Sequence, residues 1–304
     1  MVGQIAGIPY FDLNSRPGAE EASKELGYSF IFTAPSSLDA GEQIQLVEAA
    51  VAQKVRAILI FPNDAEALCP ALKKAMEAGI IVISWDTDVQ AGCRHLYQNQ
   101  ASAESIGRGQ TRIMCDLLGG PGKCVGEVAI LSTTTSAANQ NAWIKWMRKE
   151  WEKPEYTKMK LVTIAYGDDA DQKSYDEASG LLESYPNLKG IISPTSVGLA
   201  AAARLLEDQG LVGKIQLTGL GLPNQLRQYV KSGVLPKFAL WNPKNQGYLT
   251  VYMADALSTG AIQGNQGDTF QAGRLGDFTV GKEGVVLLGP PLIFDRNNID
   301  KYDF

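Results

Sequence analysis

A regular alternation of short apolar runs with amphipathic segments constrains the fold of this chain more than any other feature. Residues 55–61 (VRAILIF) and 80–85 (IIVISW) are nearly continuous apolar runs, and the segment 67–79 between them has helical character. Strands of this kind are typical of parallel sheets that helices cover on both faces. The alternation therefore predicts an α/β fold with doubly wound parallel sheets.

The same alternation continues through the whole chain and divides it into two similar halves. Strands are expected at 4–7, 28–34, 55–61, 80–85, 127–132, 160–167, 188–193, 214–221 and 237–241. Helices are expected at 18–27, 39–53, 67–79, 138–151, 172–185, 196–210, 224–233 and 245–260. Asp39, Ser102 and Asp171 are expected to cap helices. Two halves predict two Rossmann-like lobes, with a ligand cleft between them at the carboxyl ends of the strands.

Composition and motifs exclude several classes of function. A net charge of −5 without a basic run argues against a nucleic-acid surface. No apolar segment approaches the roughly 20 residues that span a bilayer. His95 is the only histidine, so a Ser-His or Cys-His catalytic site would depend on one residue in a loop-like stretch. No cofactor or metal motif is complete, and we expect a binding protein without a cofactor rather than an enzyme.

The four cysteines allow two interpretations. Cys69, Cys93, Cys115 and Cys124 form no CxxC pair, and their spacing fits no zinc site. They are either reduced thiols in the core, or they form disulfides in an oxidising compartment, Cys69 with Cys93 and Cys115 with Cys124. Cys69 opens the helix after one strand and Cys93 follows the next strand, and such edges are adjacent in a parallel sheet. Spacing alone leaves both interpretations open.

Uncharged amides, carboxylates and aromatic side chains recur where the predicted strands end. A carboxylate accepts hydrogen bonds from two hydroxyls at once, amides both donate and accept, and an aromatic face packs against a pyranose ring. This combination favours a small neutral polyol over a phosphate. For Asp88 a turn or cap is an equal alternative. The candidate ligand-binding residues are Tyr10, Phe11, Asp86, Asp88, Asn139, Gln140, Pro194, Thr195, Ser196, Trp241 and Asn242.

At these residues the sequence resembles the type I periplasmic sugar-binding proteins of ABC importers, the ribose-binding-like family. Two branches share LCPALKKAM, SWDTD, NQNAW and the terminal NIDKYDF: the L-rhamnose-binding proteins and the autoinducer-2 receptors. The autoinducer-2 pattern maps onto Gln4, Asp86, Asn139 with Gln140, and Pro194 with Ser196. Gln4 and Asn139 replace its lysine and one of its acids, whereas SPTSVGLAAAARLLED and GVVLLGPPLIFD are similar to the rhamnose branch.

The resemblance implies further properties of the chain. A three-strand hinge would cross between lobes near Gln100, Trp241 and Arg274, and the lobes would close around the ligand. The first lobe would comprise 1–100 plus 242–273, and the second 101–241 plus 274–304. The partners would be a neutral monosaccharide and the membrane permease of an ABC transporter. A monomer is expected, in the periplasm or outside the cell, including a lipid-anchored form attached through a removed N-terminal signal region.

Three classes of function compete. The first is an extracytoplasmic solute-binding protein for L-rhamnose, and the second is an autoinducer-2 receptor with the same fold and transport partners. The third is the effector domain of a LacI-type repressor. The absence of an N-terminal helix-turn-helix and of a run of basic residues counts against this third class. An enzyme comes last because no catalytic constellation is present.

Overall fold

The chain forms two compact units in a computed structural model that describes residues 1–304. The first unit contains Met1–Ser102 and Asn242–Pro290, and the second contains Ala103–Trp241 and Pro291–Phe304. Both units carry parallel sheets with helices, so the predicted parallel α/β organisation is confirmed.

The third passage of the chain between the units lies at Pro290 and Pro291, and the expected position near Arg274 is wrong. Arg274 donates hydrogen bonds to Glu21 and Asn245, both of the first unit. Further along, β11 (Val285–Leu287) pairs in parallel with β3 (Leu96–Asn99) of the same unit. These ion-pair and backbone hydrogen bonds hold residues 274–290 in the first unit rather than in the second.

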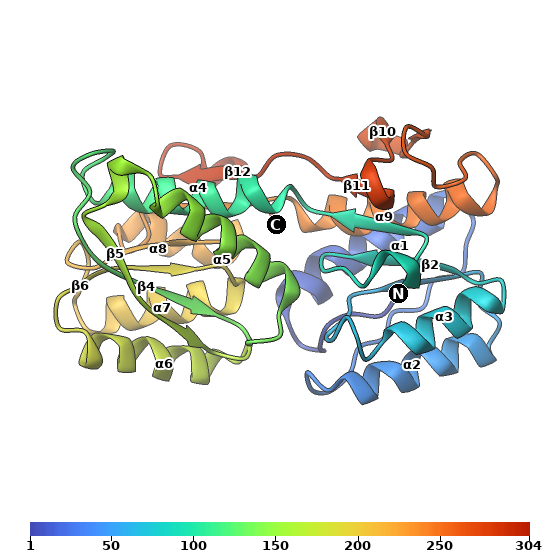
Figure 1. The fold of residues 1–304 in the computed structure, drawn as a ribbon, viewed down its shortest axis with the longest axis horizontal. Coiled ribbons are helices and arrows are strands. Elements are labelled where there is room, and N and C mark those ends of the chain that lie inside the picture. Colours follow the sequence, from blue (N-terminus) through green and yellow to red (C-terminus); the bar gives the residue numbers. More distant parts are fainter. The chain divides into compact units, whose positions relative to one another are not determined.

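The first unit is a four-stranded parallel sheet in the order β1-β2-β3-β11. Helices α1 and α9 pack together on one face, and α2 and α3 pack together on the other (Figure 1). Its strands are β1 (Ala57–Ile60), β2 (Ile81–Trp85), β3 and β11, with an antiparallel pair of β9 (Thr269–Gln271) and β10 (Asp277–Thr279). Its helices are α1 (Arg16–Glu25), α2 (Ala40–Ala52), α3 (Cys69–Glu77) and α9 (Pro243–Ser258). A π-helical turn, η1 (Phe11–Ser15), leads directly into α1. Short 3-10 turns lie at η2 (Ala91–Cys93), η4 (Gly273–Leu275) and η5 (Lys282–Gly284).

The two strands expected at the start of the chain are reduced to single bridges. Val2 bridges to Thr33 and to Ile60, whereas residues 4–7, expected as a strand, form a bend and a turn. Gly7 has a φ of +90°, which ends any extended run there. Residues 28–34 likewise form only the bridge at Thr33 and no strand.

The second unit is a four-stranded parallel sheet in the order β5-β4-β6-β7. Helices α4 and α5 pack together, as do α6 and α7, and the two pairs cover opposite faces (Figure 1). The strands are β4 (Gly126–Ser132), β5 (Met159–Tyr166), β6 (Leu188–Ser193) and β7 (Gln216–Gly219), plus the antiparallel pair β8 (Lys237–Leu240) and β12 (Leu292–Asp295). The helices are α4 (Ala103–Leu117), α5 (Ala138–Trp151), α6 (Asp171–Ser184), α7 (Ser196–Asp208) and α8 (Pro223–Ser232), with 3-10 turns η3 (Pro154–Tyr156) and η6 (Ile299–Lys301).

One of the predicted helix caps is confirmed and another is wrong. The Asp39 side chain accepts hydrogen bonds from the backbone N–H groups of Gly41 and Glu42, so it caps α2 as expected. Asp171 does not cap α6, whose N-cap position is Ala170. Its carboxylate instead pairs with Arg204 at 2.6 Å, because α6 and α7 lie side by side.

A buried carboxylate joins three segments of the second unit. Glu150, whose side chain is 1% exposed, receives Arg108 at 2.6 Å and Arg112 at 2.8 Å from α4. Lys153 approaches it to 2.7 Å, and the Tyr156 hydroxyl donates to it at 3.2 Å. Burial alone would raise the pKa of Glu150, but the hydrogen bonds from Lys153, Arg112 and Arg108 outweigh burial and lower it from 4.5 to about 2.

This cluster generates a prediction about acid stability. A carboxylate with a depressed pKa stabilises the fold above its unfolded pKa of 4.5 and loses that contribution as the pH falls towards about 2. Glu150→Gln removes the shared counter-charge of three cations, of which Arg108 retains Glu104, so it should lower the free energy of unfolding at pH 7 by roughly 2–4 kcal/mol. Urea unfolding at pH 7 and pH 3 measures both effects.

The matched control is Glu152→Gln, which changes an exposed acid two residues further on. The control should unfold like the wild type at pH 7. An equal loss of stability between pH 7 and pH 3 in wild type and Glu150→Gln would show that Glu150 does not carry the acid sensitivity.

Candidate functional site

The carboxyl end of β2 places Asp86 in an unusual backbone conformation. Asp86 has a φ of +66°, and the N–H of Thr87 donates to the carbonyl of Trp85 at 2.8 Å. This is a three-residue turn centred on Asp86, a strained geometry that aspartate tolerates better than bulkier side chains do. The turn stops the strand abruptly and fixes the Asp86 carboxylate at the edge of the sheet. Asp86 is buried there, with 4% of its surface exposed.

A buried hydrogen-bonded ring surrounds this carboxylate. The Tyr10 hydroxyl donates to Asp86 Oδ2 at 2.7 Å, and Gln246 Nε2 donates to the same oxygen at 3.1 Å. The Tyr10 oxygen also lies 2.5 Å from Gln246 Oε1. A phenol has one proton, so Tyr10 serves one of the two acceptor oxygens at a time. Two neutral donors therefore meet at one oxygen of this carboxylate.

Two glycines permit the close packing that brings Tyr10 and Gln246 to Asp86. A Cβ at Gly18 would lie 1.8 Å from the carbonyl oxygen of Lys244, and one at Gly247 would lie 1.9 Å from that of Ser15. The turn η1, helix α1 and helix α9 thus meet backbone to backbone. Only glycine allows this approach, because any side chain would force the helices apart.

Aromatic side chains form the apolar part of this edge. The rings of Phe11, Phe61 and Trp85 pack edge to face, with centroids 5.3–5.7 Å apart, and Tyr10 packs against Phe11 at 5.0 Å. All four residues are buried. The indole Nε1–H of Trp85 is buried without a hydrogen-bond partner in the protein. The predicted pair Tyr10 and Phe11 is therefore gathered with Asp86, and Phe61 and Trp85 join them.

Asp88 has a different role from Asp86. Arg94 Nε and Nη2 donate to its two carboxylate oxygens at 2.6 and 2.7 Å, and the Ser84 hydroxyl donates at 2.5 Å. Arg94 is itself buried and also donates to the carbonyl of Glu283 at 2.8 Å. This bidentate pair fixes the loop after Asp86. Asp88 therefore has a structural role in this loop, and its contact with a ligand stays a prediction.

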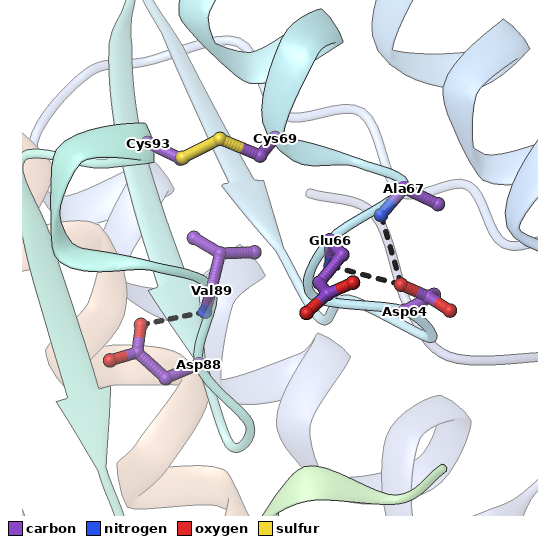
Figure 2. The surroundings of a disulfide bond; sticks show 7 residues. All are labelled: Asp64, Glu66, Ala67, Cys69, Asp88, Val89 and Cys93. Atoms are coloured by element: carbon purple, nitrogen blue, oxygen red, sulfur yellow. Dashed lines mark hydrogen bonds between the residues drawn. A yellow bond between two sulfur atoms is a disulfide. The ribbon is translucent and has the colours of Figure 1, made fainter.

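Two disulfides are present in the structure. Cys69 at the start of α3 is joined to Cys93 in the loop after β2, with Cα atoms 5.2 Å apart (Figure 2). The Asp64 carboxylate, which precedes this helix, accepts from the N–H groups of Glu66 and Ala67, and the Asp88 carboxylate accepts from Val89 (Figure 2). Cys115 and Cys124 are likewise joined, with Cα atoms 5.0 Å apart.

Tyr97 of β3 supports the same edge, whereas the preceding His95 contacts the start of β2. The Tyr97 hydroxyl donates to the backbone carbonyl of Asp86 at 3.0 Å, and burial, followed by the negative charges of Asp88 and Asp86, raises the pKa of Tyr97 well above its usual value. His95 Nδ1 accepts from the N–H of Val82 at 3.0 Å, and burial lowers the pKa of His95. His95 is therefore a neutral structural acceptor.

In the second unit, Gln140 lies at the carboxyl end of β4. Its Oε1 accepts from the hydroxyl of Ser132 at 2.6 Å and from the N–H of Thr133 at 3.0 Å, and the residue is 6% exposed. Asn139 precedes it in α5 and accepts from the N–H of Gln140 at 2.7 Å. The two predicted amides thus stand at the N-terminal turn of α5, directly above the end of the strand.

The remaining predicted residues take several positions. Thr195 donates its hydroxyl to Asp169, a residue that the sequence analysis did not single out. Trp241 packs against Trp143 with ring centroids 5.9 Å apart, and both are buried. Asn242 caps α9 by accepting from Lys244 and Asn245. Gln4 is buried, and its carbonyl accepts from Asn63. Pro194 and Ser196 flank Thr195 at the start of α7.

Sequence reasoning missed Gln246, Asp169 and Trp143. Gln246 lies one helical turn inside α9, where an amide resembles any other helix residue until the packing shows that it is buried. Asp169 lies in the loop after β5, so the same strand-end criterion that selected Asp86 applies to it. No group of three or more His, Cys, Asp or Glu residues is arranged to hold a metal ion.

Residues 1–262 match the periplasmic binding protein domain family. A sugar ABC transporter structure from Actinomyces odontolyticus is 41% identical with a TM-score of 0.80, covering 100% of this chain and 96% of that one. An ABC transporter solute-binding protein of Clostridium phytofermentas with bound L-rhamnose is 34% identical with a TM-score of 0.93, covering 99% and 96%.

A third similar structure carries a different ligand. LsrB from Clostridium saccharobutylicum, in complex with AI-2, is 25% identical with a TM-score of 0.93, covering 100% of this chain and 98% of that one. No helix of the present structure has both the length and the apolar character required to cross a membrane.

The glycine contacts generate a prediction about the ring around Asp86. Gly247→Ala places a methyl group against the Ser15 carbonyl, so it should lower the free energy of unfolding by more than 2 kcal/mol as α9 moves away. Gly180→Ala in α6 meets open space and should instead raise it by about 0.5–1 kcal/mol. Urea unfolding of both variants measures the difference. A Gly247→Ala protein as stable as Gly180→Ala would contradict the close approach of α9 to η1.

Proposed function

The chain belongs to the periplasmic binding protein domain family, and on that basis we propose that it captures L-rhamnose, a neutral 6-deoxyhexose. The chain is an extracytoplasmic sugar-binding protein of an ABC transporter and not an enzyme. Its partners are accordingly a sugar and a membrane permease.

The observation that carries the proposal is the buried Asp86 carboxylate with neutral hydrogen-bond donors. Tyr10 and Gln246 both donate to it, and the rings of Phe11 and Trp85 pack together at the same edge. A carboxylate in such a setting accepts strong hydrogen bonds from hydroxyl groups, and the neighbouring rings offer apolar faces. A neutral sugar, which has hydroxyl groups and an apolar ring face, satisfies both features.

The second unit supplies groups of the same chemical character. Asn139 and Gln140 stand at the end of β4, Thr195 at the end of β6, and the indole rings of Trp143 and Trp241 pack together. We assign the hydroxyl and ring contacts of the second unit to these residues. We further propose that hinge closure retains the bound sugar. Gln4, Pro194, Ser196 and Asn242 complete the proposed contact set.

The choice of L-rhamnose rests on two supports. The L-rhamnose-bound relative from Clostridium phytofermentas is 34% identical, against 25% for the LsrB protein with AI-2. In addition, Gln4 and Asn139 stand where the autoinducer-2 pattern has a lysine and an acid. AI-2 remains the second candidate because the fold similarity to LsrB is equally high, with a TM-score of 0.93.

Asp86→Asn provides the first test of the proposed sugar site. Replacing the carboxylate with an amide should weaken L-rhamnose binding at least tenfold, because a hydrogen bond to a charged acceptor contributes about 1.5–3 kcal/mol. Titration calorimetry measures the affinity, and Asp116→Asn, which changes an exposed acid of α4, is the matched control. Wild-type affinity in Asp86→Asn would remove Asp86 from the site.

Ligand identity is tested separately with the wild-type protein. A ligand that binds only the folded state raises the melting temperature, so a thermal-shift series with L-rhamnose, L-fucose, D-ribose and AI-2 ranks the candidates. We expect the largest shift with L-rhamnose. A shift with AI-2 alone would assign the chain to the receptor branch instead.

A further inference from the structure

Three loops of the second unit converge at the carboxyl end of β4. Strand β4 lies between β5 and β6 in the sheet. The loop after β5 is tied to its end, because Gly167 N–H donates to the Ser132 carbonyl and Asp168 N–H donates to that of Thr133, both at 2.9 Å. The Thr195 hydroxyl, after β6, donates to Asp169 Oδ1, after β5. This hydrogen bond links the two outer loops, so that Thr133 lies between them.

Thr133 carries a buried hydroxyl that no protein group satisfies. The residue is 1% exposed, its N–H donates to Gln140, and its Oγ1 has no hydrogen-bond partner. A buried polar group without a partner costs about 1–3 kcal/mol, so the fold gains nothing from a hydroxyl at this position. A ligand hydroxyl bound at the end of β4 would supply the partner.

Backbone strain marks the same loop. Asp168 and Asp169 have φ values of +54° and +50°, and consecutive residues other than glycine in this region are costly. The two side chains have different partners, because Asp168 pairs with Lys173 whereas Asp169 receives Thr195. The strained turn thus directs one carboxylate to the helix surface and the other to the end of the sheet.

We propose that Asp169 and Thr133 form a hydroxyl-binding subsite for two neighbouring hydroxyl groups of the sugar. The Asp169 carboxylate accepts from one hydroxyl while Thr195 holds it in place, and Thr133 Oγ1 exchanges a hydrogen bond with the next. This subsite rests on the proposed sugar-binding function. It implies that the second unit selects sugars that carry two hydroxyl groups on adjacent carbons. A sugar lacking either hydroxyl should be discriminated against strongly, because it leaves these polar groups unpaired.

The experiment combines variants with ligand analogues. Asp169→Asn and Thr133→Val should each weaken binding of the best wild-type sugar about ten- to hundredfold in titration calorimetry. Monodeoxy analogues of that sugar are then titrated into each protein. The wild type should lose affinity for the analogue that lacks the recognised hydroxyl, whereas the matching variant should bind sugar and analogue almost equally.

Matched controls separate binding from folding. Asp168→Asn changes the adjacent acid with the same backbone conformation, and Thr218→Val removes another buried hydroxyl without a partner, within β7 of the same sheet. Both controls should retain wild-type affinity, and thermal unfolding without sugar reports any loss of stability. If the wild type binds sugar but Asp169→Asn and Thr133→Val keep its affinity and its analogue selectivity, the subsite is overturned while the proposed function stands. Absence of any sugar binding by the wild type would overturn both.

Discussion

A buried carboxylate must be hydrogen-bonded, and much of the first unit is organised around that requirement at Asp86. Its side chain is held by Tyr10 from the turn η1 and by Gln246 from α9. These groups reach it because Gly18 and Gly247 let the two helical segments touch through their backbones. These two donors orient the carboxylate, and an acceptor that is already oriented binds a sugar hydroxyl without reorganisation.

Both units have an aspartate with a positive φ after the end of a strand. Asp86 follows β2 with a φ of +66°, and Asp169 follows the end of β5 with a φ of +50°. Each accepts a hydrogen bond from a hydroxyl on another element, Tyr10 in one case and Thr195 in the other. A left-handed aspartate at a strand end reverses the chain sharply and keeps the carboxylate at the sheet edge. The surrounding hydrogen bonds and, in the first unit, the Cys69–Cys93 disulfide and the Asp88–Arg94 pair hold this strained turn.

The parallel α/β organisation and the position of Asp86 were predictable, because apolar strand runs and the residues that follow them are local in sequence. Residues 274–290 were misplaced, since β11 has three residues and its pairing with β3 is a long-range event that no local pattern specifies. Gln246 was missed for a related reason: its burial depends on the approach of α9 to η1. Asp88 resembled Asp86 in sequence, and only the folded position of Arg94 shows that the Asp88 carboxylate is paired with this cation.

The central claim is that Asp86 accepts hydrogen bonds from a neutral sugar while Tyr10 and Gln246 hold it in position. A crystal structure of the protein grown with L-rhamnose tests this claim most directly. We predict sugar hydroxyl oxygens about 2.5–3.0 Å from the Asp86 carboxylate, with the Tyr10 and Gln246 hydrogen bonds retained. A sugar bound with no hydroxyl in hydrogen-bonding distance of Asp86 would contradict the account.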